Sequence, residues 1–275
     1  MVELGGLLAV ALVLLLGDTG AQRGPLILAP VLGPARMVAP GLLGFNGEAV
    51  TGGRAVWSDP GFVGAVAALR PAVLRVFGGA PANYWDWRAG TFVAASLLPP
   101  HVRAVRAQAR VRLADWARII RATGAIPVFD LNLLTSDLAS QLAMLGAARR
   151  LGMPITEVEL GNELYLPQYA GRFPDGGAYG RVATRWIHAI ARRFPGVRAA
   201  ADAFPGSDTN TGRTDARERA WNVRLLRALR GAAALSFHAY FSSGLAAGAT
   251  AASAPSARVV LRAAARRWAA LSPVI

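Results

Sequence analysis

The feature that most constrains this chain is a regular alternation of short apolar segments with helix-like segments, repeated six times after Pro40. Apolar segments of β-strand length occupy 42–46, 72–77, 126–132, 155–161, 197–203 and 233–241. Segments with helical spacing of apolar residues follow them at 59–69, 101–123, 136–151, 178–194, 215–230 and 256–271. This alternation is typical of parallel strands joined by right-handed helical crossovers.

Two architectures use such crossovers, the TIM-type (β/α) barrel and the doubly wound open sheet. A doubly wound dinucleotide-binding sheet places a glycine-rich phosphate loop after its first strand, whereas residues 46–49 here are NGEA. We therefore expect an α/β fold of the TIM-barrel type over 41–275. It would be incomplete, with about six βα units and the start of a seventh strand at 272–275.

The first 40 residues differ in composition from the rest. Residues 4–16 are an unbroken run of apolar residues and glycine, too short to span a bilayer. Small residues at 19–21 resemble a cleavage site, so 1–21 is expected to be a secretory signal peptide, with an uncleaved N-terminal anchor as the alternative. The expected location is secreted or cell envelope/periplasmic, with no stable membrane span if the signal is cleaved. Residues 22–40 are a proline-rich extended lead-in.

The formal net charge of +14 comes entirely from arginine, which is scattered over the helix-like segments with few aromatic neighbours. Nucleic-acid grooves combine a basic stripe with stacking aromatics, so we expect no nucleic-acid partner. The charge is compatible with an acidic polysaccharide. The chain has no cysteine and three histidines, and no metal-ligand spacing appears. We expect neither a metal nor a cofactor.

One strand ends in an Asn-Glu pair, where the segment 155–165 reads ITEVELGNELY. Barrel enzymes place their chemistry at the carboxyl ends of the strands. We therefore predict that Glu163 is the general acid/base of a retaining glycosidase, the alternative being a surface glutamate after a strand. Asn162 is suited to hydrogen-bond a sugar hydroxyl beside the scissile bond.

Polar residues also stand at the ends of other predicted strands. Substrate contacts are predicted for Asn46, Asn132, His238 and Tyr240. The alternative for the two asparagines is that they cap turns, which is their commoner use. His238 and Tyr240 are two residues apart and would face the same side of a strand.

Two further charges lie inside apolar strands. Glu159 is expected to point into the barrel, and Arg75 is the single charge of the strand 72–77. We predict that they form a buried ion pair that supports the site, rather than touching substrate, because a buried charge needs a partner.

A retaining glycosidase needs a second carboxylate about 5 Å from the first. Asp130 and Asp202 are candidates, but nothing in their surroundings marks either one as a nucleophile. Tyr84, Trp85 and Trp87 could form an aromatic platform for a sugar or fill the core beneath a long loop.

Two segments, VFDLNLL at 128–134 and VELGNE at 158–163, resemble the third and fourth strands of the heparanase-like glycosidases. LRVFGG at 74–79 is similar to that family's second strand, and HAY at 238–240 to its sixth. The resemblance implies an eight-fold barrel, Glu163 as proton donor, and a nucleophilic glutamate at the end of strand seven. No nucleophile is then expected within these 275 residues, so the sequence is expected to be a fragment, with edges at the first and sixth strands.

The resulting expectation is a retaining glycoside hydrolase of the β-glucuronidase or heparanase-like type. Its partner would be an oligo- or polysaccharide, including acidic ones. One alternative is a carbohydrate-binding barrel remnant without catalysis. Another is a structural protein of the cell envelope that uses only the scaffold.

Overall fold

The computed structural model describes residues 44–47, 57–105, 110–206 and 214–238, together with Val259, Arg262 and Arg266. Several predictions lie outside these described residues: the signal peptide or anchor at 1–21, the lead-in at 22–40, Tyr240, and the seventh strand at 272–275. Most of the predicted helix 256–271 also lies outside them.

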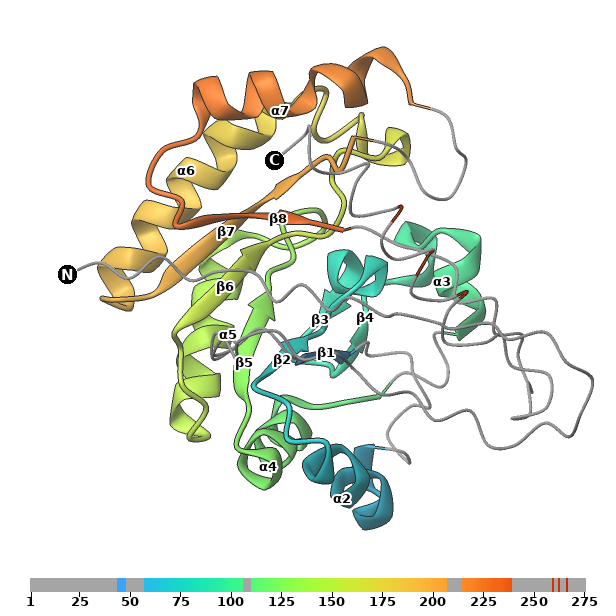
Figure 1. The fold of residues 1–275 in the computed structure, drawn as a ribbon, viewed down its shortest axis with the longest axis vertical. Coiled ribbons are helices and arrows are strands. Elements are labelled where there is room, and N and C mark those ends of the chain that lie inside the picture. The colour runs from blue at the N-terminus through green and yellow to red at the C-terminus, as the bar shows by residue number, and fades with distance from the viewer. Residues whose placement is uncertain are drawn as a thin grey trace, which may run out of the picture.

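Six parallel strands form the central sheet, which is curled into a half-barrel (Figure 1). In spatial order they are β1 (Gly44–Gly47), β2 (Val73–Val76), β5 (Ile126–Asp130), β6 (Glu157–Leu160), β7 (Arg198–Ala203) and β8 (Ala234–Phe237). Every neighbouring pair is parallel, so each connection is a crossover. The predicted incomplete TIM-type barrel is confirmed, and β1 and β8 are the edge strands among the described residues.

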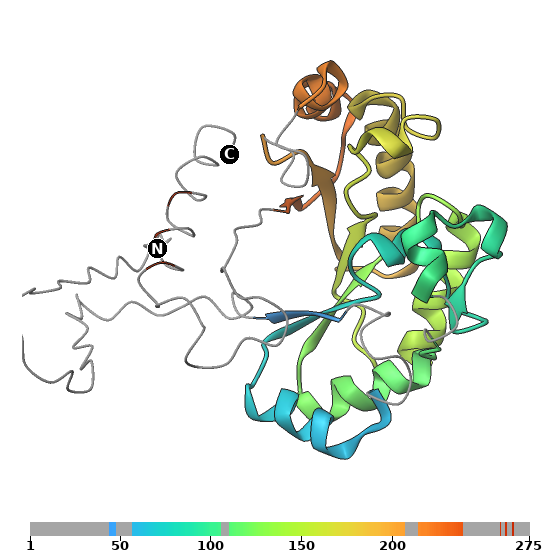
Figure 2. The same cartoon turned by 90° about the vertical axis from the view of Figure 1, so that its right-hand side faces the viewer.

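The helices lie along one side of this sheet (Figure 2). They are α2 (Pro60–Ala68), α4 (Leu113–Thr123), α5 (Leu138–Arg150), α6 (Gly176–Arg193) and α7 (Ala216–Ala228). Four of them begin after an aspartate whose carboxylate accepts a backbone N–H of the first turn, namely Asp59, Asp137, Asp175 and Asp215. These caps satisfy N–H groups that the helix itself leaves unpaired, which fixes where each helix starts.

The connection from β2 to α4 differs from the prediction. It contains three short helices and a hairpin: η1 (Ala80–Tyr84), β3 (Trp85–Asp86), β4 (Thr91–Phe92), η2 (Ala95–Leu97) and α3 (Pro100–Val105). The single helix predicted at 101–123 is wrong, because α3 ends at Val105 and α4 starts at Leu113. Arg112 has an extended backbone, and its N–H donates to the Asp115 carboxylate, so a new helix begins there. A further short helix, η3 (Pro167–Tyr169), follows β6.

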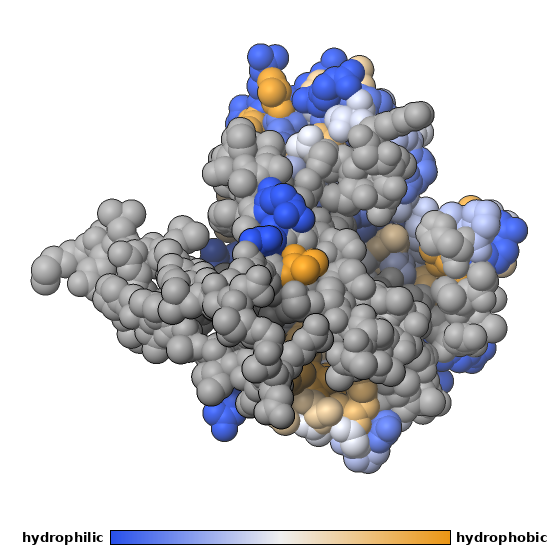
Figure 3. Space-filling view, turned by 45° about the vertical axis from the view of Figure 1, so that its right-hand side comes forward, coloured by the Kyte–Doolittle hydropathy of each residue, from blue (hydrophilic) through white to orange (hydrophobic). Residues whose placement is uncertain are grey.

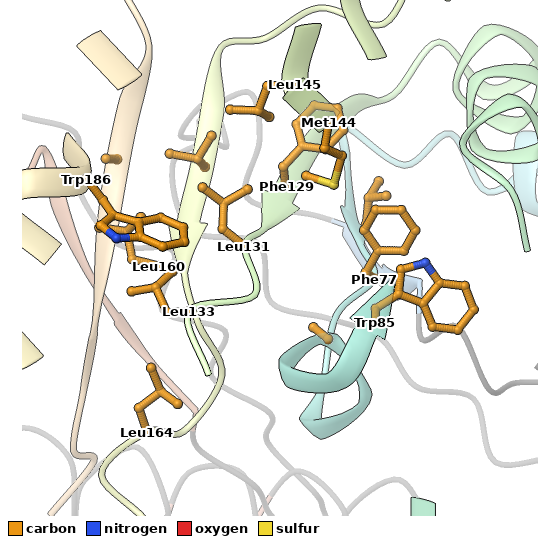
Figure 4. Close-up of a cluster of buried hydrophobic side chains, with 14 of the residues drawn as sticks. Phe77, Trp85, Phe129, Leu131, Leu133, Met144, Leu145, Leu160, Leu164 and Trp186 are labelled. Atoms are coloured by element: carbon orange, nitrogen blue, oxygen red, sulfur yellow. The ribbon is translucent and has the colours of Figure 1, made fainter. Parts of the chain in front are cut away.

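The core lies between the sheet and the helices (Figure 4). Side chains from three strand ends and from α5 pack together there, including Phe77, Phe129, Leu131, Met144 and Leu160. Tyr84 and Trp85 are also buried, which agrees with the alternative that they fill the core beneath the loop. The indole of Trp87 is only partly buried.

The described residues visible in Figure 3 are mostly hydrophilic, with apolar residues in small separate patches. Scattered exposed apolar side chains such as Phe45 and Leu69 are usual for a folded chain. Within the described ranges, no helix has both the length and the apolar character required to cross a bilayer.

Candidate active site

Glu163 lies in a tight turn just beyond the carboxyl end of β6. The turn contains two residues with left-handed backbone, Gly161 at φ 88° and Glu163 at φ 51°. For a residue with a side chain this conformation costs about 1–2 kcal/mol, so the surrounding structure must hold Glu163 in place. The glutamate is 7% exposed. It therefore stands at the rim of the half-barrel with its side chain largely covered, and the alternative of a solvent-exposed surface glutamate is wrong.

Asn83, from η1, holds this turn. Its Nδ2 donates to the carbonyl oxygen of Asn162 at 2.8 Å, and its Oδ1 accepts the Asn162 N–H at 3.2 Å. On the other side of Glu163, the N–H of Leu164 donates to the Asp202 carboxylate and the carbonyl of Leu164 accepts from Arg217 Nη2 at 2.8 Å. Both peptides that flank Glu163 are thus fixed by side chains from other elements.

His238, directly after β8, bridges two carboxylates. Its Nδ1 lies 3.1 Å from Glu163 Oε1, and its Nε2 lies 3.1 Å from Glu159 Oε1. Burial opposes the charged imidazolium, but the hydrogen bonds to Glu159 and Glu163 outweigh it and raise the pKa of His238 to about 10. At neutral pH the ring is therefore protonated and donates a hydrogen bond from each nitrogen.

The predicted ion pair between Arg75 and Glu159 is present. The Nε of Arg75 contacts Glu159 Oε2, and the Ser236 hydroxyl donates to Glu159 Oε1. Burial would raise the pKa of Glu159, but the bond to His238 and the charge of Arg75 outweigh it and lower that pKa to about 2. Glu159 is consequently an ionised carboxylate enclosed by donors, which fits the supporting role predicted for it.

The same guanidinium reaches two residues from the predicted binding set. Arg75 Nη2 donates to Asn162 Oδ1 at 3.1 Å, and Arg75 Nη1 to Asn46 Oδ1 at 3.4 Å. Gly78 makes this approach possible, because a Cβ at that position would lie 1.8 Å from Asn46 Oδ1. Asn46 and Asn162 therefore stand together beside Arg75.

Asn132 serves a different purpose. Its Nδ2 donates to the Trp85 carbonyl at 3.2 Å and to Thr135 Oγ1 at 2.9 Å, while its Oδ1 accepts the Thr135 N–H at 2.9 Å. The structure thus shows Asn132 in the turn-capping role that was the alternative to substrate contact.

The two candidates for the second carboxylate are both buried. Burial raises the pKa of Asp202 to about 8 and the pKa of Asp130 well above its ordinary value. Arg75 Nη2 lies 2.8 Å from Asp130 Oδ2 as an ion pair, and neither Asp130 oxygen has a hydrogen-bond partner among the described residues. Asp130 is 1% exposed and Asp202 is fully buried, so neither carboxyl group is open to a substrate and neither fits the nucleophile role.

The cluster itself defines what this end of the barrel can do. Glu163, His238, Glu159 and Arg75 alternate in charge along a continuous set of contacts. No three His, Asp or Glu side chains in the described part of the chain are arranged to hold a metal ion. The arrangement is suited to moving a proton at Glu163, which is held on a rigid barrel rim. The fold and site together define an incomplete (β/α) barrel with a buried cluster of acidic and basic side chains at its strand ends.

Solved structures with a similar fold include a family 51 α-L-arabinofuranosidase from Bifidobacterium longum, with a TM-score of 0.56 and 19% identity over 85% of this chain and 50% of that one. Another is the α-L-arabinofuranosidase of Thermotoga maritima, with a TM-score of 0.54 and 19% identity over 74% of this chain and 47% of that one. The chain thus spans about half the length of these structures. No protein-family model and no curated protein matches the sequence.

These structures share with this chain a glycosidase-like barrel fold, which agrees with the resemblance at the level of fold. They do not single out the heparanase-like family, because both are named as arabinofuranosidases.

Three contributors to the site were missed by sequence reasoning, namely Asn83, Ser236 and Arg217. Ser236 had a usable signal, since it lies two residues before His238 in an otherwise apolar strand. Asn83 and Arg217 gave none, because each acts on a turn that is far away in the sequence.

Proposed function

We propose that this protein hydrolyses glycosidic bonds, with Glu163 as the general acid/base. The observation that carries the proposal is the contact of 3.1 Å between Glu163 Oε1 and the protonated Nδ1 of His238 at the rim of the barrel. Through this contact the ring N–H of His238 holds the carboxyl group of Glu163 in a fixed orientation. Glu163 would give its own carboxyl proton to the oxygen of the leaving sugar and later take one back from the attacking water.

The neighbouring groups support this role. Glu159 and Arg75 hold His238 and Asn162 in position through the contacts described above. With its oxygen bound to Arg75, Asn162 would contact a sugar hydroxyl through Nδ2. Hydrogen bonds of this kind strengthen as the reacting sugar approaches the transition state.

The proposal also concerns the stereochemistry of the hydrolysis and the identity of the sugar. The resemblance favours a retaining β-glucuronidase, whereas the similar solved structures are named as α-L-arabinofuranosidases. Aryl β-glucuronides and aryl α-L-arabinofuranosides are therefore the first substrates to compare. A retaining reaction also needs a nucleophilic carboxylate, which the resemblance places at the end of the strand after β8.

The test is hydrolysis by the wild type and by Glu163→Gln over a series of aryl leaving groups. Loss of a general acid should slow the reaction by about 10²–10⁴-fold. The loss should be smallest for leaving groups of low pKa, because these need little protonation. A uniform loss over the whole series would contradict the acid role of Glu163.

A second candidate function is carbohydrate binding without turnover. It is favoured by the burial of both Asp130 and Asp202, which leaves neither carboxyl group open to a substrate as a nucleophile. Binding of an oligosaccharide by the wild type, with no hydrolysis of any aryl glycoside, would select this candidate.

A further inference from the structure

A cavity of about 470 Å³ lies between the β3–β4 hairpin and the start of α5. Its lining includes Asp86, Trp87, Arg88, Val93, Asp137 and Ser140. The size falls in the range of about 300–1,000 Å³ that is usual for small-molecule sites. Trp85 and Asn132 also line it, whereas Glu163, His238, Glu159 and Arg75 do not, so the cavity does not include the charged cluster of the candidate active site.

The indole of Trp87 is held rigidly in this cavity. Its Nε1 donates to Ser140 Oγ at 3.2 Å, and the guanidinium carbon of Arg88 lies 4.5 Å from the centre of its ring. Arg88 Nη1 donates to the same Ser140 Oγ at 2.7 Å. Because α5 and Arg88 fix the ring before any ligand arrives, binding against it costs little side-chain entropy.

The charges in the lining select against an anionic ligand. The lining contains two carboxylates, Asp86 and Asp137, and one guanidinium, Arg88, which gives a formal charge of −1. One oxygen of Asp86 accepts the Arg88 N–H at 2.9 Å, and one oxygen of Asp137 accepts the Ser140 N–H at 2.7 Å. The second oxygen of each carboxylate can accept from a ligand hydroxyl.

This combination matches a sugar ring without charge. Hydroxyl groups of a sugar would donate to the carboxylates, while its C–H groups pack on the indole and on Val93. A uronate or sulfated sugar would instead meet a lining with a net formal charge of −1, at an energetic cost.

The cavity and the candidate active site share a supporting loop. Thr135, which lines the cavity, donates through Oγ1 to the Asn83 carbonyl at 2.8 Å. Asn83 in turn holds Asn162, next to Glu163. Both sites therefore belong to the same rim, built on the carboxyl ends of β5 and β6.

We infer that this cavity is a second carbohydrate subsite, which binds an uncharged sugar unit of an oligosaccharide whose reacting unit lies at Glu163. The inference rests on the proposed glycoside-binding function of the Glu163 site. It extends that function by requiring a substrate of several units, with a neutral sugar away from the reacting bond.

The test uses the full chain carrying Glu163→Gln, so that binding is measured without turnover. Xylopentaose, arabinopentaose and cellopentaose are compared by calorimetry with their trimers and with pentagalacturonate. At least one neutral pentamer should bind about 10-fold more tightly than its trimer. Trp87→Ala should abolish this gain, while Trp87→Phe should retain part of it because a ring remains. Asp86→Asn should increase the affinity for pentagalacturonate by removing a like charge.

Equal binding of the neutral pentamers by the parent, Trp87→Ala and Trp87→Phe, with all three folded by circular dichroism, would overturn the inference. So would a parent that binds pentagalacturonate more tightly than every neutral pentamer, or binds none of them. None of these readouts requires catalysis. Absence of hydrolysis by the wild type would therefore count against the enzymatic proposal alone.

Discussion

The side chain of Asn83 makes two hydrogen bonds to the backbone of Asn162. It accepts the Asn162 N–H at 3.2 Å and donates to the Asn162 carbonyl at 2.8 Å. Asn83 is fully buried. The residue that follows Asn162 is Glu163, whose left-handed backbone needs external support. The position of the proposed acid thus depends on an amide from the loop after β2.

Replacing Asn83 by alanine should therefore reduce activity more than its effect on stability would suggest. A misplacement of about 1 Å can cost about 10²-fold in rate, so we expect kcat to fall by about 10- to 100-fold. Asn222 offers a matched control, since it makes the same pair of bonds to the N–H and carbonyl of Phe204, at 2.8 and 2.9 Å.

Both asparagine variants should lose about 1–3 kcal/mol of unfolding free energy, because each leaves backbone groups without partners. Measuring kcat and denaturant unfolding for both separates the two effects. If Asn222→Ala lost as much activity as Asn83→Ala, general destabilisation would explain both results and the positioning role would be refuted.

Stability should decrease as the pH rises from about 6.5 to about 10. The pKa of His238 is raised to about 10 in the folded state, against about 6.5 in an unfolded chain. Its contribution is complete below the unfolded value and is lost as the pH passes through the folded value. The His238→Gln variant should lack this decrease. Equal slopes of unfolding free energy against pH in both proteins would contradict the charged state of His238.

Asp202 should add a second decrease at lower pH. Its folded pKa of about 8 exceeds the ordinary value of 3.8, so the folded state keeps a proton that the unfolded state releases between these values. Stability therefore falls as the pH rises from about 4 to about 8. In the Asp202→Asn variant the unfolding free energy should change less over this pH range, because asparagine can still accept the Leu164 N–H but does not titrate. Chemical unfolding at several pH values measures the effect.

Arg75→Lys should destabilise the fold by roughly 2–4 kcal/mol, because lysine cannot reach all the partners of the guanidinium and leaves buried carboxylates poorly paired. Arg198→Lys is the matched control on the same sheet. Arg198 pairs with Glu157 at 3.3 Å, but its side chain is 65% exposed, against 17% for Arg75. That change should cost less than about 0.5 kcal/mol. A comparable loss of unfolding free energy in the two variants would contradict the larger contribution expected from the buried Arg75.

Gly161→Ala should distort the turn that carries Glu163. A Cβ there would lie 2.4 Å from Leu164 Cδ1, and the φ of 88° is unfavourable for alanine. Gly152 has a similar φ of 84° with open space around it, so Gly152→Ala measures the backbone cost alone, about 1–2 kcal/mol. Gly161→Ala should cost at least about 1 kcal/mol more because Leu164 is buried. Equal melting temperatures for the two variants would contradict this packing argument.

The barrel was predictable because each strand and helix carries its own local pattern. Arg75 and Glu159 could also be paired from sequence, since each is a charge within an apolar strand that must find a partner. The hairpin β3–β4 could not be predicted, because only two residue pairs form it. The break between α3 and α4 could not be predicted either, because it depends on the capping hydrogen bonds at the start of α4. The role of Asn83 was equally invisible, since an asparagine in a loop has no periodic pattern to identify its partner.

The contacts that build the charged cluster join residues far apart along the chain. Arg75 meets Glu159 across 84 residues, and Glu159 meets His238 across a further 79. Contacts with such long sequence separation form late, because closing the intervening loops costs entropy before they are made. Catalysis would then appear only after the whole sheet from β2 to β8 has assembled, and recovery of activity during refolding would time the final step.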